Sequence, residues 1–269
     1  ITGIDDGKGF FMKIMRLHRW LLDEYKRDGS FAWGKTIVGY STLVLAIIII
    51  SGLVIWYPRN RKALKNRFKI RTKAGWFRFL YDLHVSGGFY AALLLLILAL
   101  TGLTWSFGWY RDAFYTAFGI STTSKQTHAP TSAVPQKTAG ERGSKKHPKT
   151  DYTQWSEVLA DLQSRYPEYK SISIQDGSAT VSTAAYGNTR GSDRYSFDPA
   201  TGKITEIQLY KDLPKSAKIR GWIYSVHAGT WGGLTTRILS CLVSLLGAVF
   251  AITGYYFWIK KKLRKSKQR

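Results

Sequence analysis

The chain has 269 residues, a net charge of +23 and a single cysteine, Cys241, which excludes any disulfide within the chain. The positive charge is not spread evenly, because arginine and lysine crowd two short segments, residues 59–73 and 260–269. Both segments border long apolar stretches, where the positive-inside rule places cytoplasmic charge. No stacking aromatics are interleaved on a folded basic face, so we expect no nucleic-acid partner.

Three apolar stretches have the length of membrane-spanning helices: Ile37 to Tyr57, Val85 to Phe107, and Ile238 to Ile259. At about 1.5 Å per helical residue, each covers a hydrocarbon core about 30 Å thick. Backbone polar groups cannot stay unpaired in lipid, so each stretch is predicted to be an α-helix. The sequence therefore indicates a multi-pass α-helical membrane protein whose first partner is the lipid bilayer.

The basic segments set the expected topology. With both in the cytoplasm, the first span runs inward, the second outward and the third inward again. An N-terminus outside the membrane, without a signal peptide, leads us to expect one further helix upstream that starts in the cytoplasm.

The segment outside the membrane has two parts. Residues 117–150 are rich in Ser, Thr, Pro, Gly and Lys, a composition that predicts a mobile linker. Its histidines, His128 and His147, are not expected to be functional. After it we predict an amphipathic helix from Tyr152 to Arg165 and then short strands, a small extracytoplasmic α+β domain. The predicted strands cover residues 171–175, 180–185, 193–197 and 204–210, the last two joined by the turn DPATGK.

The chain is thus divided into consecutive segments on either side of the bilayer and within it. The predicted boundaries are an extracytoplasmic start with an amphipathic helix (1–34), a span (35–58), a cytoplasmic basic loop (59–80), a span (81–108), an extracytoplasmic linker (109–150), the α+β domain (151–221), a span (222–259) and a cytoplasmic basic tail (260–269).

Histidines stand at the mouths of two spans. His84 begins the second span, at the expected cytoplasmic edge, and Gly87 and Gly88 follow it on the same helical face. Those glycines would admit either a flat macrocycle or a neighbouring helix close to the backbone. His227 opens the third span at the expected external edge. Ionisable residues at membrane depth are functional candidates by default.

A third histidine, His18, lies in the amphipathic stretch FFMKIMRLHRWLLDEY, on its apolar face. A lone histidine in that position is more often a hydrogen-bonded core residue than a ligand. The expected topology nevertheless puts His18 and His227 on the same side of the membrane. Two imidazoles from separate helices can ligate one haem iron from opposite faces, which suits electron transfer.

Other roles for these histidines fit less well. No cysteine or carboxylate joins them, as a structural zinc site would require, and a proton relay would call for acidic residues within the spans. His18 and His227 are therefore candidate ligands of one haem b, with packing within the protein as the alternative. His84 is the candidate ligand of a second haem b, whose other ligand would come from an upstream helix or another protein. Arg237 could pair with a haem propionate, although snorkelling to the interface is a slightly better explanation of its position.

Each span closes on a small residue, a glycine and aromatics, in the sequences SGLVIW, TGLTWSF and TGYYFW. Together with FFMKIMRLHRWLL, LHVSGGFYAALLLLILALTG and VHAGTWGGLTTRILSCLVSLLGAVFAITGYYFW, these endings resemble the PepSY-associated transmembrane family. The helix-plus-strands segment with SFDPATGKI is similar to a PepSY domain. The resemblance implies four main spans, so the first span and its histidine would be absent here.

The resemblance also implies a function. It points to haem-dependent electron transfer from a cytoplasmic reductant or membrane quinol, with reduction of a ferric siderophore outside the membrane as the best-known role. The alternative is a PepSY-type membrane regulator or binding protein without a cofactor, whose histidines would be packing residues. A haem spectrum would discriminate between the two.

Overall fold

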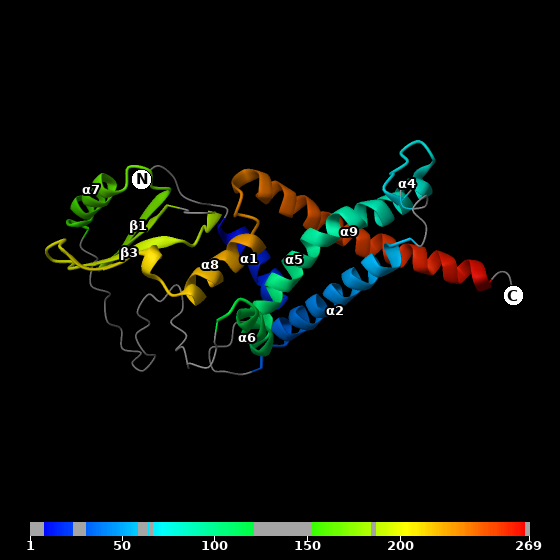
Figure 1. Ribbon diagram of the computed structural model, residues 1–269, viewed down its shortest axis with the longest axis horizontal. Helices are drawn as coiled ribbons and strands as arrows, with labels where there is room; N and C mark the ends of the chain where they lie inside the picture. The colour runs from blue at the N-terminus through cyan, green and yellow to red at the C-terminus, as the bar shows by residue number, and fades with distance from the viewer. Residues whose placement is uncertain are drawn as a thin grey trace. The chain divides into compact units, whose positions relative to one another are not determined.

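The computed structural model describes residues 8–23, 31–58, 64, 67–120, 152–183 and 187–266. The chain forms two compact units, one made of residues 1–111 and 226–269 and the other of residues 112–225. Figure 1 shows long helices in the first unit and a small sheet with short helices in the second.

The first unit contains the helices long and apolar enough to cross a membrane. In chain order its elements are α1 (Lys8–Trp20), α2 (Trp33–Trp56), α4 (Trp76–Asp82), the π-helical turn η1 (Leu83–Gly87), α5 (Gly88–Ser106), the start of α6 (Gly108–Ala117) and α9 (Gly233–Ser266). The elements α4, η1 and α5 join into one continuous helix of 31 residues. The three predicted spans are confirmed, and each is longer than its apolar stretch.

Helix α5 packs against both α2 and α9. Small residues make the close approach possible: a side chain at Gly39 of α2 would crowd Ser106 and Phe107, and one at Gly247 of α9 would crowd Leu95. Near the other end of α2 the ring of Trp56 stacks on Phe89 with centroids 3.9 Å apart. Interfaces of small residues and stacked rings are how helices associate where lipid removes the hydrophobic drive between them.

Most of the apolar surface on these helices is exposed. Side chains such as Val54 (71% exposed), Leu93 (68%) and Ile252 (70%) contact almost nothing else in the described part of the chain. A water-soluble protein does not leave apolar faces of this extent uncovered. The protein is therefore a membrane protein, and these faces meet lipid or further apolar helices.

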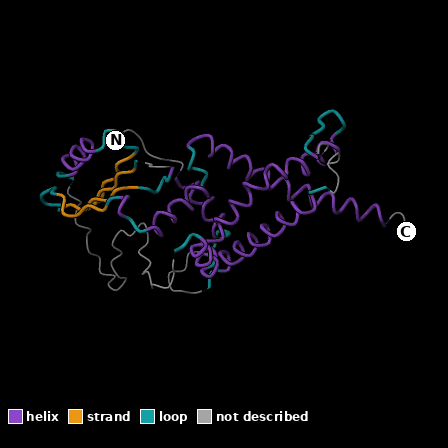
Figure 2. The backbone as a smooth tube through the Cα atoms, in the orientation of Figure 1, coloured by secondary structure: helices purple, strands orange, loops and turns teal. Residues whose placement is uncertain are grey.

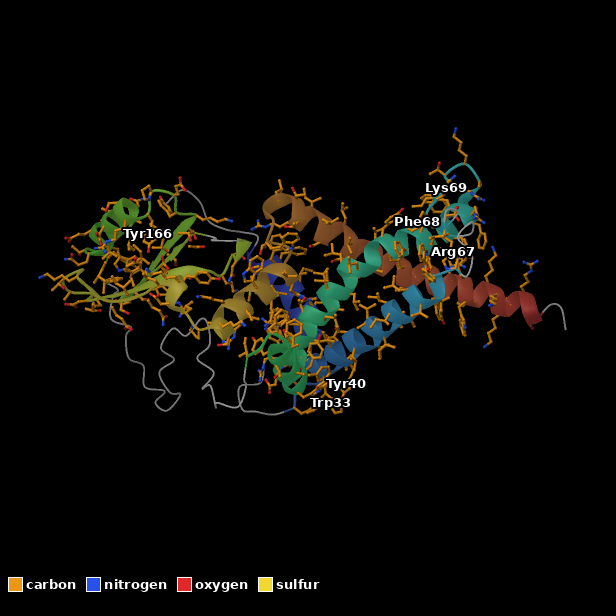
Figure 3. The ribbon with its side chains drawn as sticks, in the orientation of Figure 1. Trp33, Tyr40, Arg67, Phe68, Lys69 and Tyr166 are labelled. Atoms are coloured by element: carbon orange, nitrogen blue, oxygen red, sulfur yellow. The ribbon has the colours of Figure 1, made fainter. Side chains whose placement is uncertain are left out.

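The described parts of the basic segments, residues 67–73 and 260–266, lie at one end of the helices. The ammonium of Lys260, in the last part of α9, sits 3.8 Å from the ring centre of Phe77 in α4. Figure 3 shows Arg67, Phe68 and Lys69 near the end of α2, with Trp33 and Tyr40 at its other end. This grouping fits the expected placement of both basic segments on the cytoplasmic side.

Two helices differ from expectation. The third span does not begin at residue 222, because α8 (Lys215–His227) ends at His227 and α9 starts at Gly233. Gly229 and Gly233 have φ of 65° and 70°, left-handed values that end one helix and redirect the next. Helix α1 ends at Trp20 rather than near Tyr25. Leu21 and Leu22 take positive φ there, while the Leu22 N–H donates to the carbonyl of Arg16 as in a Schellman cap.

The second unit is a four-stranded antiparallel sheet with one covering helix, drawn in orange and purple in Figure 2. The strands β1 (Ser171–Gln175), β2 (Ser178–Ser182), β3 (Ser192–Phe197) and β4 (Ile204–Gln208) follow the order of the sequence. Helix α7 (Trp155–Arg165) buries Val158 and Leu162 against Val181, Tyr195 and Phe197. The short η3 (Tyr210–Asp212) and α8 as far as Ser225 complete the unit, while His227 at the end of α8 belongs to the first unit.

The predicted α+β domain is confirmed in its order of elements. Strand β1 has its predicted bounds, whereas β2 begins two residues before Thr180 and ends at Ser182. The turn DPATGK is present, with Gly202 at φ 69°. The predicted linker, with His128 and His147, falls largely on residues 121–151, outside the described residues, as do parts of the basic loop and the last three residues of the tail.

Replacing Leu162 by alanine tests this core. Leu162 is fully buried between α7 and the sheet, so Leu162→Ala is expected to lower the free energy of unfolding of this unit by about 2–5 kcal/mol. Amide hydrogen exchange of β2 in the detergent-solubilised protein measures the loss. Ser156→Ala, at an exposed position of the same helix, should change it by less than about 0.5 kcal/mol. Equal exchange in the two variants would contradict this core.

Candidate functional site

The structure brings His18 and His227 together. His18 lies in the last turn of α1, and His227 is the last residue of α8. Their ring centres are 6.0 Å apart, with the ring planes tilted by 36°. The indole of Trp105, near the end of α5, lies 5.1 Å from the ring of His227 and forms a wall beside it. Two histidines 209 positions apart in sequence thus face each other at one end of the helices.

This spacing suits a single metal ion between the rings. With metal–nitrogen bonds of about 2 Å, two imidazoles on opposite faces of one metal have ring centres roughly 6 Å apart. In the described part of the chain no three His, Cys, Asp or Glu residues gather as a metal site. A pair of imidazoles without further protein ligands matches a metal whose remaining positions a macrocycle fills, as in haem. The residues present therefore fit haem.

The hydrogen bonds of His227 fix which nitrogen is free. Its Nδ1 lies 3.0 Å from the carbonyl oxygen of Leu98 and 3.1 Å from Oγ1 of Thr101, both on α5. A carbonyl only accepts, so Nδ1 carries the hydrogen and donates it. Burial is the main cause that lowers the pKa of His227, and the nearby His18 lowers it further, against a smaller rise from the Leu98 carbonyl. The neutral ring then leaves Nε2 with a free lone pair.

A close contact between the end of α1 and the start of α2 holds α1, and therefore His18, in place. Asp23 follows the end of α1, and its Oδ2 accepts the backbone N–H of Gly34 at the start of α2, at 3.1 Å. Gly34 is buried, and any side chain there would collide with the carbonyl of Trp20. The absence of a side chain at Gly34 therefore sets how closely α1 approaches α2. His18 itself is exposed.

His84 lies at the other end of α5, in the π-helical turn η1. Its Nδ1 is 2.8 Å from Oγ1 of Thr253 on α9, and the rings of Phe250 and Phe257 meet it edge to face at 5.9 and 5.8 Å. A π-turn inside an α-helix is rare and occurs often at functional sites. Gly87 and Gly88 were expected to share one helical face with His84, but their surroundings differ. A Cβ at Gly87 would contact Leu83 and Phe250, whereas a Cβ at Gly88 would meet nothing within 4 Å.

The two histidine sites lie near opposite ends of the same helix. Thr101, which contacts His227, follows His84 by 17 positions in one continuous helix. At 1.5 Å per residue this corresponds to roughly 25 Å along the axis, close to the thickness of a hydrocarbon core. The two histidines are therefore separated along the helix by about the thickness of a hydrocarbon core.

The fourth predicted site residue is not part of this arrangement. Arg237 is exposed in the second turn of α9, and in the described residues no hydrogen bond or ion pair joins it to either imidazole. Its role towards a propionate stays a prediction. The threonines that contact the imidazoles were not predicted as site residues, although the repeated TG of TGLTWSF and TGYYFW contained the signal.

The second unit offers a polar network of its own. The hydroxyl of Tyr166 donates to Oδ2 of Asp193 at 2.6 Å and also lies 2.6 Å from the hydroxyl of Tyr195. Burial and the neighbouring Asp193 carboxylate raise the pKa of Tyr166 well above its usual range. Asp193 also accepts the backbone N–H of Tyr210 at 2.6 Å, so the network ties β3 to its neighbours. We interpret it as structural.

Comparison with known proteins assigns the chain to a family. A family model described as the PepSY-associated TM region matches residues 1–261, which is nearly the whole chain. No curated protein matches the chain.

Gly34 provides a test of how His18 is held. Gly34→Ala forces a methyl group against the Trp20 carbonyl and is expected to destabilise the α1–α2 junction by about 1–3 kcal/mol. Amide hydrogen exchange in α1 should rise accordingly. Gly52→Ala is the matched control, since a Cβ at Gly52, on the same helix, meets nothing within 4 Å. Unchanged exchange in Gly34→Ala would contradict the junction.

Proposed function

The chain belongs to the PepSY-associated TM family, and we propose that it binds haem b and passes electrons across a bacterial inner membrane to a ferric chelate outside. The observation that carries the proposal is the facing pair His18 and His227, with ring centres 6.0 Å apart and Nδ1 of His227 donating to a carbonyl. Such a pair offers two nitrogen ligands from separate helices and leaves no open coordination position for oxygen.

The chain's own residues would hold the outer haem in three ways. His18 and His227 present their imidazoles from α1 and α8. Trp105 supplies a flat apolar wall beside His227. A bis-imidazole haem supplies reversible one-electron redox chemistry without binding substrate at the iron. Arg237, at the same end of α9, is the candidate partner of a propionate.

His84 would hold a second haem b near the cytoplasmic face. Its Nδ1 is engaged by Thr253, so Nε2 is the nitrogen left for a metal. A second ligand for that haem would come from another segment or another protein. Electrons would enter here from a cytoplasmic reductant or membrane quinol and leave through the His18–His227 site.

The substrate class follows from the resemblance to siderophore reductases. An electron delivered outside the membrane would convert a bound ferric ion to ferrous, while the chelator itself stays intact. Ferrous iron binds hard oxygen donors less tightly, so the chelate releases it. A ferric siderophore is therefore the substrate that we propose.

A haem spectrum with histidine variants tests the outer site. The purified protein from haem-replete cells should show a reducible Soret and α-band spectrum. His18→Ala and His227→Ala should each remove the outer haem while leaving membrane insertion unchanged. His128→Ala replaces a histidine outside the pair and should leave the haem content unchanged. A colourless wild-type protein would favour the alternative, a PepSY-type regulator without cofactor, and an unchanged haem content in His227→Ala would refute the pairing.

Substrate reduction is tested in sealed, right-side-out membrane vesicles loaded with reductant. An impermeant ferrous chelator outside should report reduction of an added ferric siderophore. The rate in His227→Ala vesicles should fall to that of vesicles without the protein. A rate that His227→Ala does not alter, in vesicles whose wild-type protein holds haem, would refute the proposed route.

A further inference from the structure

Two Thr–Gly pairs contact the two half-buried imidazoles of His84 and His227 in the same way. Thr101 and Gly102 on α5 contact His227, and Thr253 and Gly254 on α9 contact His84. Each pair lies on one long helix and serves a histidine of another segment. The continuous helix Trp76–Ser106 has both features, because it contains His84 in η1 and the pair that contacts His227 in α5. We call each pair an imidazole seat.

The threonines contribute an acceptor. Oγ1 of Thr253 lies 2.8 Å from the carbonyl of Val249, and Oγ1 of Thr101 lies 2.7 Å from that of Ile97. A hydroxyl has one hydrogen, which these helix carbonyls take, so each oxygen keeps a lone pair for an imidazole Nδ1–H. His227 independently shows this direction, since its Nδ1 also faces the carbonyl of Leu98.

The glycines contribute space. A Cβ built on Gly102 would lie 3.1 Å from Cε1 of His227, and one on Gly254 would lie 3.2 Å from Cε1 of His84. Both distances are tighter than ordinary carbon–carbon contact at about 3.5–4.0 Å. A methyl group at either position would push the ring away from the hydroxyl that orients it.

We propose that Thr101–Gly102 and Thr253–Gly254 are positioning residues that hold His227 and His84 in the Nδ1–H tautomer, with Nε2 directed to a metal. The inference rests on the proposed haem function for its purpose, while the tautomer itself can be measured without haem. Outer-shell hydrogen bonds of this kind fix ring orientation and raise the basicity of the ligand.

The two seats differ in one respect that sharpens the test. His227 has a second acceptor in the Leu98 carbonyl, whereas the Nδ1 of His84 faces Thr253. Removing the Thr253 hydroxyl should therefore have a larger effect than removing that of Thr101. Both glycines should be equally sensitive.

The first experiment measures tautomers in the haem-free full chain by NMR of isotope-labelled histidine. The wild-type protein should show His84 and His227 as Nδ1–H tautomers. Thr253→Val should shift His84 towards the Nε2–H form, and Thr253→Ser should restore it. Thr42→Val is the matched control, because the Thr42 hydroxyl also donates to a carbonyl one turn earlier, that of Val38. A wild-type His84 that is mainly Nε2–H would overturn the proposal.

The second experiment uses the haem-loaded protein. Thr253→Val should weaken haem retention at the His84 site about 10–100-fold and raise its midpoint potential, because a less basic ligand stabilises ferric iron less. Gly254→Ala and Gly102→Ala should perturb the electron paramagnetic resonance signal of their own site. Gly247→Ala is the control, since its Cβ would be equally close, 3.2 Å, to Leu95 instead of an imidazole.

The outcomes separate the two proposals. A wild-type protein without haem but with Nδ1–H histidines refutes the proposed function and keeps the seats. A haem-loaded protein whose potential and signal are the same in Thr253→Val and Gly254→Ala as in the wild type refutes the seats and keeps the function.

Discussion

The absence of water in the hydrocarbon core is the constraint on which the structure depends. Each polar group there must find a partner within the protein. Helix formation satisfies the backbone, and the hydroxyls in the spans donate to carbonyls one turn earlier, as Thr42, Ser244 and Thr253 do. A hydroxyl bonded in this way still accepts a hydrogen. The spans therefore contain oriented acceptors at fixed heights, and two of them meet an imidazole.

The position of His227 depends on the break between α8 and α9. If α8 and α9 formed one straight helix, His227 would follow the direction of the span. Instead, the left-handed Gly229 and Gly233 separate the two helices, and Thr236 caps the break by donating to the carbonyl of Gly229 at 2.6 Å. The His227 ring, outside α9, contacts Leu98 and Thr101 of α5. The break, rather than the span itself, determines which residues it meets.

The sequence predicted the parts of the fold that local patterns control. Hydropathy gave the three spans, and alternation with a DPATGK turn gave the sheet, because both signals act within a few residues. The end of α1 at Trp20 was not predicted, since Leu21 and Leu22 adopt positive φ where no glycine announces it. That end depends on Asp23 reaching Gly34, eleven positions away, which no local pattern encodes.

The candidate site was predicted to a similar degree. Topology alone grouped His18 with His227, because charge determined which side each occupied. Their orienting partners could not be derived, since Thr101 and Thr253 are 126 and 169 positions from the histidines they contact. The repeated Thr-Gly was visible as a pattern, and only packing between α5 and α9 gives it a meaning. For Gly87 and Gly88 a local pattern was visible but misleading. Their predicted face assumed regular α-helical spacing after His84, whereas residues 83–87 form the π-helical turn η1.

The composition of the helix between the two histidine sites determines whether it could carry protons from one site to the other. From Val85 to Leu100 it has no acidic, basic or histidine side chain, and apart from Ser86 and two glycines its residues are aliphatic, Phe89 or Tyr90. A proton relay needs titratable groups at hydrogen-bond spacing, and over roughly 24 Å of rise this stretch supplies only Tyr90. The electron transfer that we propose would require no such chain, because carriers at the two ends would exchange electrons through the packed protein. Two imidazole sites joined by an apolar helix are therefore compatible with that proposal, whereas a proton relay along this helix would lack a continuous path.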